Sequence, residues 1–338
     1  MKTNHVAATI AILLLFPGCS SEIKESDYNF TGESGMKVTF SAVIENPENT
    51  VLTRATATSW EKGDLIGITC GDKQINVPYE YTGGSGNYFK AIDRTKEIWL
   101  MGTEEYNVSA YHPYSGESGS TPEKIAIETT SENQDTEEKR QQLDYLYATA
   151  VANRDNPDVQ LAFKHVMSRI MLTFKAGEEI ESLSDIDCYI TGAKLLGTFD
   201  PNTGETTVNE EAEIESVNQV LTASNNHTMV AFLLPQIISS RGVLIEAGMN
   251  GIYYKVELPT ADLPELKSGY SYNYTIVADK YNDNPVKLTI TDTEIIPWVN
   301  NDGGTYNPDP SLAGTEGDII PSDWENMENE DIVPVEKR

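Results

Sequence analysis

The chain has 338 residues, 39% of them hydrophobic, which is long enough for two domains that each bury a core. Its 24 Lys and Arg residues stand against 53 Asp and Glu residues, which gives a formal net charge of −29 at pH 7. A protein this acidic repels a phosphate backbone, so the composition argues against nucleic acid as a partner.

Residues 1–18 are predicted to be a targeting signal. Lys2 and His5 precede an apolar run from Val6 to Phe16, and this run is too short to span a bilayer, which needs about 20 apolar residues. The signal ends at Gly18-Cys19, which resembles a bacterial lipobox, in which the cysteine is lipidated and becomes the new N-terminus. The alternative is an ordinary secretory signal that is cut nearby.

Residues 19–35 are polar and rich in Ser and Glu, so we expect a tether. The next stretch alternates between apolar and polar residues, which predicts a half-buried strand. Its inward-facing residues are expected to be Met36, Val38, Phe40, Ala42 and Ile44.

Short strand-like runs separated by turn residues fill the chain from Asp64 onward. The glycine-rich stretch Gly83–Asn87 lies between two such runs and predicts a hairpin turn, not a phosphate-binding loop. The segment Thr136–Ala148 is predicted to begin as a short helix and to continue as a strand. Residues Asn153–Asp158 are the predicted linker between domains.

The second half repeats this pattern, with a predicted hairpin turn at Asn202–Gly204. About seven strand candidates in each half and no long helix favour an all-β fold of two tandem antiparallel β-sandwich domains. We place these domains at residues 36–157 and 158–306. Residues 307–338 hold nine acidic residues against two basic ones, which predicts an acidic C-terminal tail.

Catalytic and metal-binding patterns are not recognisable in the sequence. The four histidines are scattered, and His165 is expected to be a hydrogen-bonded structural residue. Cys70 and Cys188 are expected to be buried free thiols, although an exported protein could pair them. The oxygen-rich stretch Asp279–Asn284 lacks the acidic residue that closes a calcium loop, so a simple turn is expected. We therefore predict no enzyme activity, no metal and no cofactor.

Several segments together resemble the fimbrillin family of Bacteroidetes, the lipoprotein subunits of surface fimbriae. Each segment is weakly diagnostic alone, but they follow one another in the family's order behind a lipobox-like signal. They are Leu52–Ile68, Leu143–Ala150, Leu161–Gly177, Leu266–Lys280 and Ile290–Trp298.

This resemblance implies transthyretin-like β-sandwich domains and export as a precursor that is lipidated at Cys19. It also implies trypsin-like cleavage between Arg54 and Ala55, followed by polymerisation in which a strand of one subunit fills a groove in the next. The acidic tail, residues 307–338, is the candidate donor segment. The alternative for Arg54 is an arginine at a strand end that is paired or solvated.

The function expected from these features is a structural or adhesive subunit of a cell-surface fimbrium, held to the outer membrane by its lipid anchor. Its expected partners are other fimbrial subunits and ligands on host or bacterial surfaces. The alternative is a surface lipoprotein that binds glycans or host ligands without polymerising. The role as a stalk, anchor or tip subunit stays open.

Overall fold

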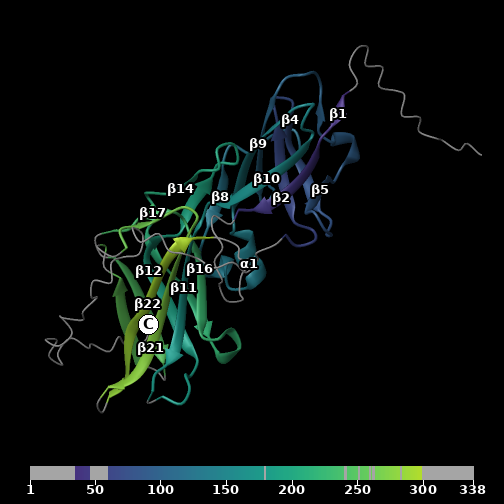
Figure 1. The fold of residues 1–338 in the computed structure, drawn as a ribbon. Coiled ribbons are helices and arrows are strands. Elements are labelled where there is room, and N and C mark those ends of the chain that lie inside the picture. Colours follow the sequence, from purple (N-terminus) through teal and green to yellow (C-terminus); the bar gives the residue numbers. More distant parts are fainter. Residues whose placement is uncertain are drawn as a thin grey trace, which may run out of the picture. The chain divides into compact units, whose positions relative to one another are not determined.

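In the computed structural model, the described residues are 35–45 and 60–298, apart from 179, 240–241, 250–251, 259, 261–262 and 282–283. This part of the chain consists mainly of short strands and contains one short α-helix, which confirms the all-β prediction (Figure 1). The transthyretin-like assignment stays a prediction. The predicted signal, tether, Arg54–Ala55 cleavage site and acidic tail lie outside the described residues.

Seven strands of the first half form a closed barrel in the order β10-β2-β5-β4-β3-β7-β9. They are β2 (Thr39–Ile44), β3 (Leu65–Cys70), β4 (Gln74–Tyr81), β5 (Tyr88–Ala91), β7 (Tyr106–His112), β9 (Leu146–Ala152) and β10 (Asp158–His165). A small pair, β1 (Met36–Lys37) and β6 (Trp99–Leu100), and the 3-10 helix η1 (Arg94–Lys96) accompany them.

Two four-stranded sheets of the second half share one core and so form a sandwich. One sheet has the order β16 (Thr228–Leu233), β11 (Ser168–Ala176), β21 (Tyr270–Tyr281) and β22 (Asn284–Pro297). The other has the order β15 (Ile214–Leu221), β12 (Ile186–Lys194), β18 (Val243–Met249) and β19 (Ile252–Leu258).

Smaller elements connect the barrel and the sandwich. A three-stranded sheet joins β8 (Ile125–Glu128) from the first half to β13 (Leu196–Phe199) and β14 (Thr206–Val208) from the second. A third apolar cluster contains buried residues from both halves, among them Tyr111, Leu143 and Trp298. The remaining elements are η2 (Ser131–Asn133), α1 (Glu137–Gln142), η3 (Ala223–Asn225), β17 (Gln236–Ile237) and β20 (Glu265–Leu266).

Local predictions agree with the structure at several points. The helix expected after Thr136 is α1, and the Thr136 hydroxyl accepts a hydrogen bond from the Lys139 backbone N–H, as an N-cap does. The turn at Asn202–Gly204 joins β13 to β14, and Gly204 has a φ of 77°, which a residue with a side chain rarely adopts.

Two pairings in these sheets are parallel, in contrast to the antiparallel pattern expected from the turns. They join β2 to β10 and β11 to β21. Strand β10 begins at Asp158, the last residue of the predicted linker, and its sheet partners are the barrel strands β2 and β9. The domain boundary between residues 157 and 158 stays a prediction.

Candidate functional site: the seat of the first strand

The first long strand, β2, lies between β5 and β10 in the barrel (Figure 1). It runs parallel to β10, with Thr39–Ile44 opposite Asp158–Phe163. It runs antiparallel to β5, where only two pairs of residues face each other. We call the space between β5 and β10, together with the core that it opens onto, the β2 seat.

The alternation expected for this strand is confirmed by burial. Val38, Phe40 and Ala42 are at most 1% exposed, whereas Met36 and Ile44 are half-buried. The inward side chains belong to the apolar core of the barrel. Burial of this face is therefore a main source of the stability that holds the strand in place.

A short hydrogen-bonded chain fixes the start of the strand. The Val38 N–H donates to the Ile98 carbonyl at 2.9 Å, and the Ile98 N–H donates to the Tyr79 hydroxyl at 2.9 Å. The Phe40 ring meets the Tyr79 ring edge-on, with centroids 5.2 Å apart. Burial raises the pKa of Tyr79 to about 12, so this hydroxyl keeps its proton at neutral pH.

Trp60 covers the other end of the β2 seat. Its indole Nε1 donates to the Ala42 carbonyl at 3.0 Å, and its ring packs edge-on against Phe89 and Phe163. Trp60 follows Arg54 in the sequence, whereas Ala42 precedes it. This contact therefore joins the two chain segments on either side of the predicted cleavage position.

The residues predicted to carry lipid attachment and processing, Cys19, Arg54 and Ala55, lie outside the described residues, so both roles stay predictions. The β2 seat itself was not identified from the sequence. The alternation of Met36–Ile44 shows which face is buried but does not name β5 and β10 as its neighbours.

His165 is a buried, hydrogen-bonded residue, as expected. Its Nδ1 lies 2.6 Å from Asp144 Oδ1, and its ring stacks on Trp298 with centroids 4.1 Å apart. The Arg169 guanidinium lies over the Trp298 ring at 4.7 Å, and burial lowers the pKa of Arg169 to about 10. Among the described residues, the His165 Nε2 atom has no hydrogen-bond partner, so no serine of this part of the chain completes a triad with the pair.

The two cysteines of the described chain are buried free thiols, which confirms that prediction. Burial raises the pKa of Cys70 to about 11 and that of Cys188 to about 12, so neither is a reactive thiolate at neutral pH. Within residues 35–45 and 60–298, leaving out the gaps named above, His, Cys, Asp and Glu residues do not gather into a group that could hold a metal.

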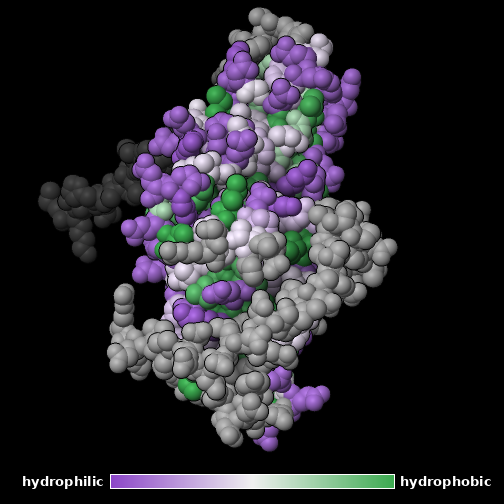
Figure 2. All heavy atoms as spheres, turned by 90° about the vertical axis from the view of Figure 1, so that its left-hand side faces the viewer, coloured by the Kyte–Doolittle hydropathy of each residue, from purple (hydrophilic) through white to green (hydrophobic). Residues whose placement is uncertain are grey.

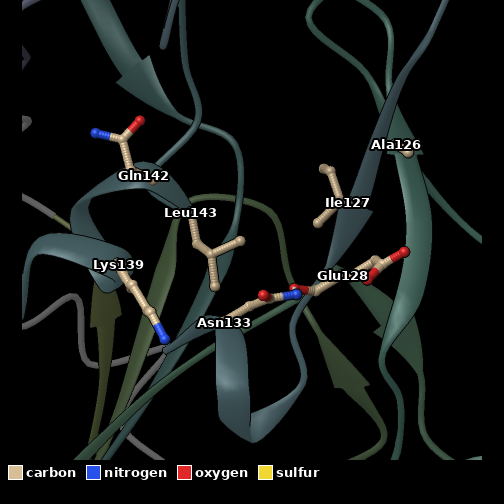
Figure 3. A pocket seen from close by; sticks show the side chains of 7 residues that line it. All are labelled: Ala126, Ile127, Glu128, Asn133, Lys139, Gln142 and Leu143. Carbon is tan, nitrogen blue, oxygen red and sulfur yellow. The ribbon is translucent and has the colours of Figure 1, made fainter. Parts of the chain in front are cut away.

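A hollow of about 350 Å³ lies between β8 and α1. Figure 3 shows Leu143 and Ile127 facing each other across it, with Lys139 and Asn133 along its rim. Its charged lining residues, Glu128 and Lys139, carry opposite signs, and it contains neither a carboxylate pair nor a nucleophile. This lining does not indicate a catalytic site.

The described part of the chain contains one α-helix, α1, and three 3-10 helices. None of its helices combines the length and the apolar character needed to cross a bilayer. Figure 2 shows apolar side chains in small groups separated by hydrophilic ones on the face that it presents. Scattered apolar residues of this kind are normal on protein surfaces.

Comparison with known proteins identifies the family of this chain. The fold is similar to two crystal structures of putative cell adhesion proteins, one from Bacteroides ovatus and one from Bacteroides uniformis. The first is 26% identical with a TM-score of 0.65, and the match covers 79% of this chain and 99% of that one. The second is 19% identical with a TM-score of 0.60, and the match covers 78% and 98%. No protein of curated function matches the sequence. The sequence profile described as fimbrillin-like matches residues 53–298, and the chain therefore belongs to the fimbrillin-like family.

Proposed function

We propose that this protein is a structural or adhesive subunit of a cell-surface fimbrium. Membership of the fimbrillin-like family supports this proposal, as does the similarity to a cell adhesion protein candidate from Bacteroides ovatus. The partners are other fimbrial subunits and ligands on host or bacterial surfaces.

Export as a precursor lipidated at Cys19 is the first part of the proposal. It is supported by the short apolar run that ends at Gly18-Cys19. One acyl chain holds a protein to a membrane only marginally, whereas several hold it firmly. A triacylated Cys19 would anchor the subunit to the outer membrane.

Assembly by strand exchange is the second part, and the observation that carries it is the position of β2. This strand precedes the cleavage position Arg54–Ala55 in the sequence, yet it lies between β5 and β10 in the barrel. Cleavage would leave β2 held by non-covalent contacts alone. A neighbouring subunit could then supply a strand to the same seat.

The energy of burial explains why the seat would not stay empty. Burying Val38 and Phe40 contributes about 1.5–3 kcal/mol for each side chain, or roughly 3–6 kcal/mol together. That loss is a large share of the stability of a typical domain, which is about 5–15 kcal/mol. A subunit that loses β2 is therefore strongly destabilised until its seat is filled again.

The geometry of the seat restricts the incoming strand. It must run parallel to β10 and antiparallel to β5 to reproduce the pairing of β2. Its inward residues must alternate, as Val38, Phe40 and Ala42 do. The candidate donors in the tail are Gly317–Pro321 and Glu330–Val335, and each contains a proline that removes one backbone donor. A subunit whose tail fails to donate would end a fimbrium instead of extending it.

Three chains test the assembly proposal in surface material from the producing cells, run on gels without boiling. The native chain should form ladders, Arg54→Ala should stay an intact monomer, and a chain ending at Tyr306 should accept a strand without donating one. Arg94→Ala, which removes an exposed arginine of η1, is the matched control and should form ladders. Unchanged ladders from both the Arg54 variant and the shortened chain would rule out strand exchange through these segments.

The lipid anchor and the non-polymerising alternative have tests of their own. Cys19→Ala should move the protein out of the detergent phase and change the precursor mass, whereas Ser20→Ala should do neither. A native protein that stays monomeric after proteolysis and whose tryptophan fluorescence is quenched by sugars would instead indicate a glycan-binding lipoprotein.

A further inference from the structure

The sandwich of the second half has an edge strand that is prone to self-pairing. Among the described strands, β16 (Thr228–Leu233) has a sheet neighbour on one side only, β11. Its sequence, TMVAFL, carries no charge and no proline. An edge strand of this composition is a template for pairing with another chain unless something covers it.

The side chain of Gln134 covers this edge. Its Oε1 accepts a hydrogen bond from the Phe232 N–H at 2.8 Å, and its Nε2 donates to the Phe232 carbonyl at 3.3 Å. Nε2 also donates to the Thr129 carbonyl at 2.5 Å, and the residue is only 4% exposed. A primary amide presents a donor and an acceptor side by side, as the backbone of a neighbouring strand does.

The side chain of Ser131 likewise forms hydrogen bonds with the backbone of β15, the edge strand of the other sheet. Its hydroxyl accepts from the Asn218 N–H at 2.9 Å and lies 3.5 Å from the Ser216 carbonyl, to which it donates. Ser131 and Gln134 are three residues apart, so one short segment reaches both sheets. We call residues Thr129–Gln134 the edge plug.

The edge plug is itself held in place from two sides. The Thr129 N–H donates to the Leu195 carbonyl at 2.8 Å, which extends the pairing of β8 with β13. On the other side, Arg140 Nη1 in α1 donates to the Gln134 carbonyl at 2.9 Å. The plug therefore comes from the first half of the chain and is fixed where it meets the second half.

We propose that the edge plug prevents β16 from pairing with β16 of a second copy of this chain. The two strands would meet antiparallel across a two-fold axis, the symmetry that most dimers use. Of the two edges, β16 is the one that would pair with a second copy. Strand β15 contains Glu215, whose charge would be repelled by the same residue of the second copy. This inference holds for the uncut chain and does not depend on cleavage at Arg54.

The decisive variant is Gln134→Met, which keeps the length of the side chain but removes the amide. Every chain in the experiment also carries Arg54→Ala, so that strand exchange at the β2 seat does not contribute to self-association. Light scattering after gel filtration should show at least a twofold higher mass for Gln134→Met. Hydrogen exchange at the Phe232 amide should rise at least tenfold.

Two further variants separate edge pairing from other effects. Gln142→Met makes the same chemical change at an exposed position of α1 and should stay monomeric. Adding Thr228→Lys to Gln134→Met places like charges on the two β16 edges and should restore the monomer, while exchange at Phe232 stays fast.

The inference is overturned if Gln134→Met stays monomeric with unchanged exchange at Phe232, or if Gln142→Met associates equally well. If Gln134→Met also speeds exchange throughout the barrel, the chain that carries both Gln134→Met and Thr228→Lys decides the question. A return to the monomer while exchange in the barrel stays fast supports pairing through β16, and continued association of this chain would overturn the inference.

Discussion

The barrel and the sandwich deal with their strand edges in different ways. The barrel closes on itself, so every strand, including β2, has a neighbour on both sides. The sandwich stays open, and side chains of the edge plug stand in for missing strands at β15 and β16. A closed barrel depends on each of its strands, and the loss of one opens a gap of one strand's width. An open sandwich offers edges that must be covered, but it depends less on any single outer strand.

The largest expected effect comes from removing the central side chain of β2. Phe40→Ala should lower the free energy of unfolding by about 3–5 kcal/mol, because the buried ring leaves a cavity in the barrel core. Urea unfolding measures this loss, and amide hydrogen exchange should become faster in the strands of the barrel. Tyr88→Ala, at an exposed ring on the neighbouring strand β5, is the control and should change stability by less than about 0.5 kcal/mol. A loss below about 1 kcal/mol for Phe40→Ala would mean that β2 does not hold the barrel closed.

A smaller effect is expected at the contact between Trp60 and Ala42, which lie on either side of the predicted cleavage position. Trp60→Phe keeps an aromatic ring but leaves the Ala42 carbonyl without its indole donor, which should cost about 1–3 kcal/mol. Thermal unfolding of the uncut chain measures it. The partly exposed Trp99 provides the control substitution, Trp99→Phe, and equal shifts from the two changes would contradict the role given to Trp60.

Alkaline pH should lower the free energy of unfolding of both the barrel and the sandwich. The pKa of Cys70 in the barrel is raised to about 11 and that of Cys188 in the sandwich to about 12, whereas unfolded thiols ionise near pH 8.5–9. Each thiol has a higher pKa in the folded state than in the unfolded state, so the folded state is favoured while the thiols keep their protons. This contribution to stability is complete below the unfolded pKa and is lost as the pH rises through the folded values of about 11 and 12.

The urea midpoint should therefore fall between pH 8 and pH 11. The fall should be smaller in Cys70→Ala for the barrel and in Cys188→Ala for the sandwich. An identical fall in the native chain and in both variants would mean that these thiols do not contribute to it.

The smallest effects are expected from surface ion pairs. Lys37 Nζ lies 2.6 Å from Glu97 Oε1 near the barrel, and Lys255 Nζ lies 3.0 Å from Glu246 Oε1 on the sandwich. Lys37→Ala and Lys255→Ala should each cost less than about 1 kcal/mol, because both lysines are half-exposed and solvent screens the pairs. Unfolding at low and high salt measures this, and a larger loss at high salt than at low salt would contradict the explanation.

Local features of the fold could be predicted from the sequence. The alternation of Met36–Ile44 indicated a half-buried strand, and the residues after Thr136 indicated a short helix. The structure confirms both because each depends on neighbours within a few residues. The resemblance to fimbrillins was also sufficient to identify the family, since its segments follow one another along most of the folded chain.

Long-range pairing could not be predicted in the same way. A strand period of two residues shows which face is buried but not which strand lies alongside, so the parallel pairing of β2 with β10 was missed. The roles of Asp144, Gln134 and Arg169 were missed as well, because their hydrogen bonds and ring contacts are made with residues distant in the sequence. Gln134 stands in a polar stretch that looks like any solvated loop.

The parallel pairing of β2 with β10 has a consequence for the kinetics of folding. Thr39 lies opposite Asp158, so about 120 residues must be synthesised before these two strands can meet. Contacts between residues so distant in sequence form slowly, because the entropy of closing the loop is lost before any contact compensates for it. Strand β2 is thus among the first segments of the barrel to be synthesised and among the last to be locked in place. During that interval the strand is accessible to a protease or to a chaperone.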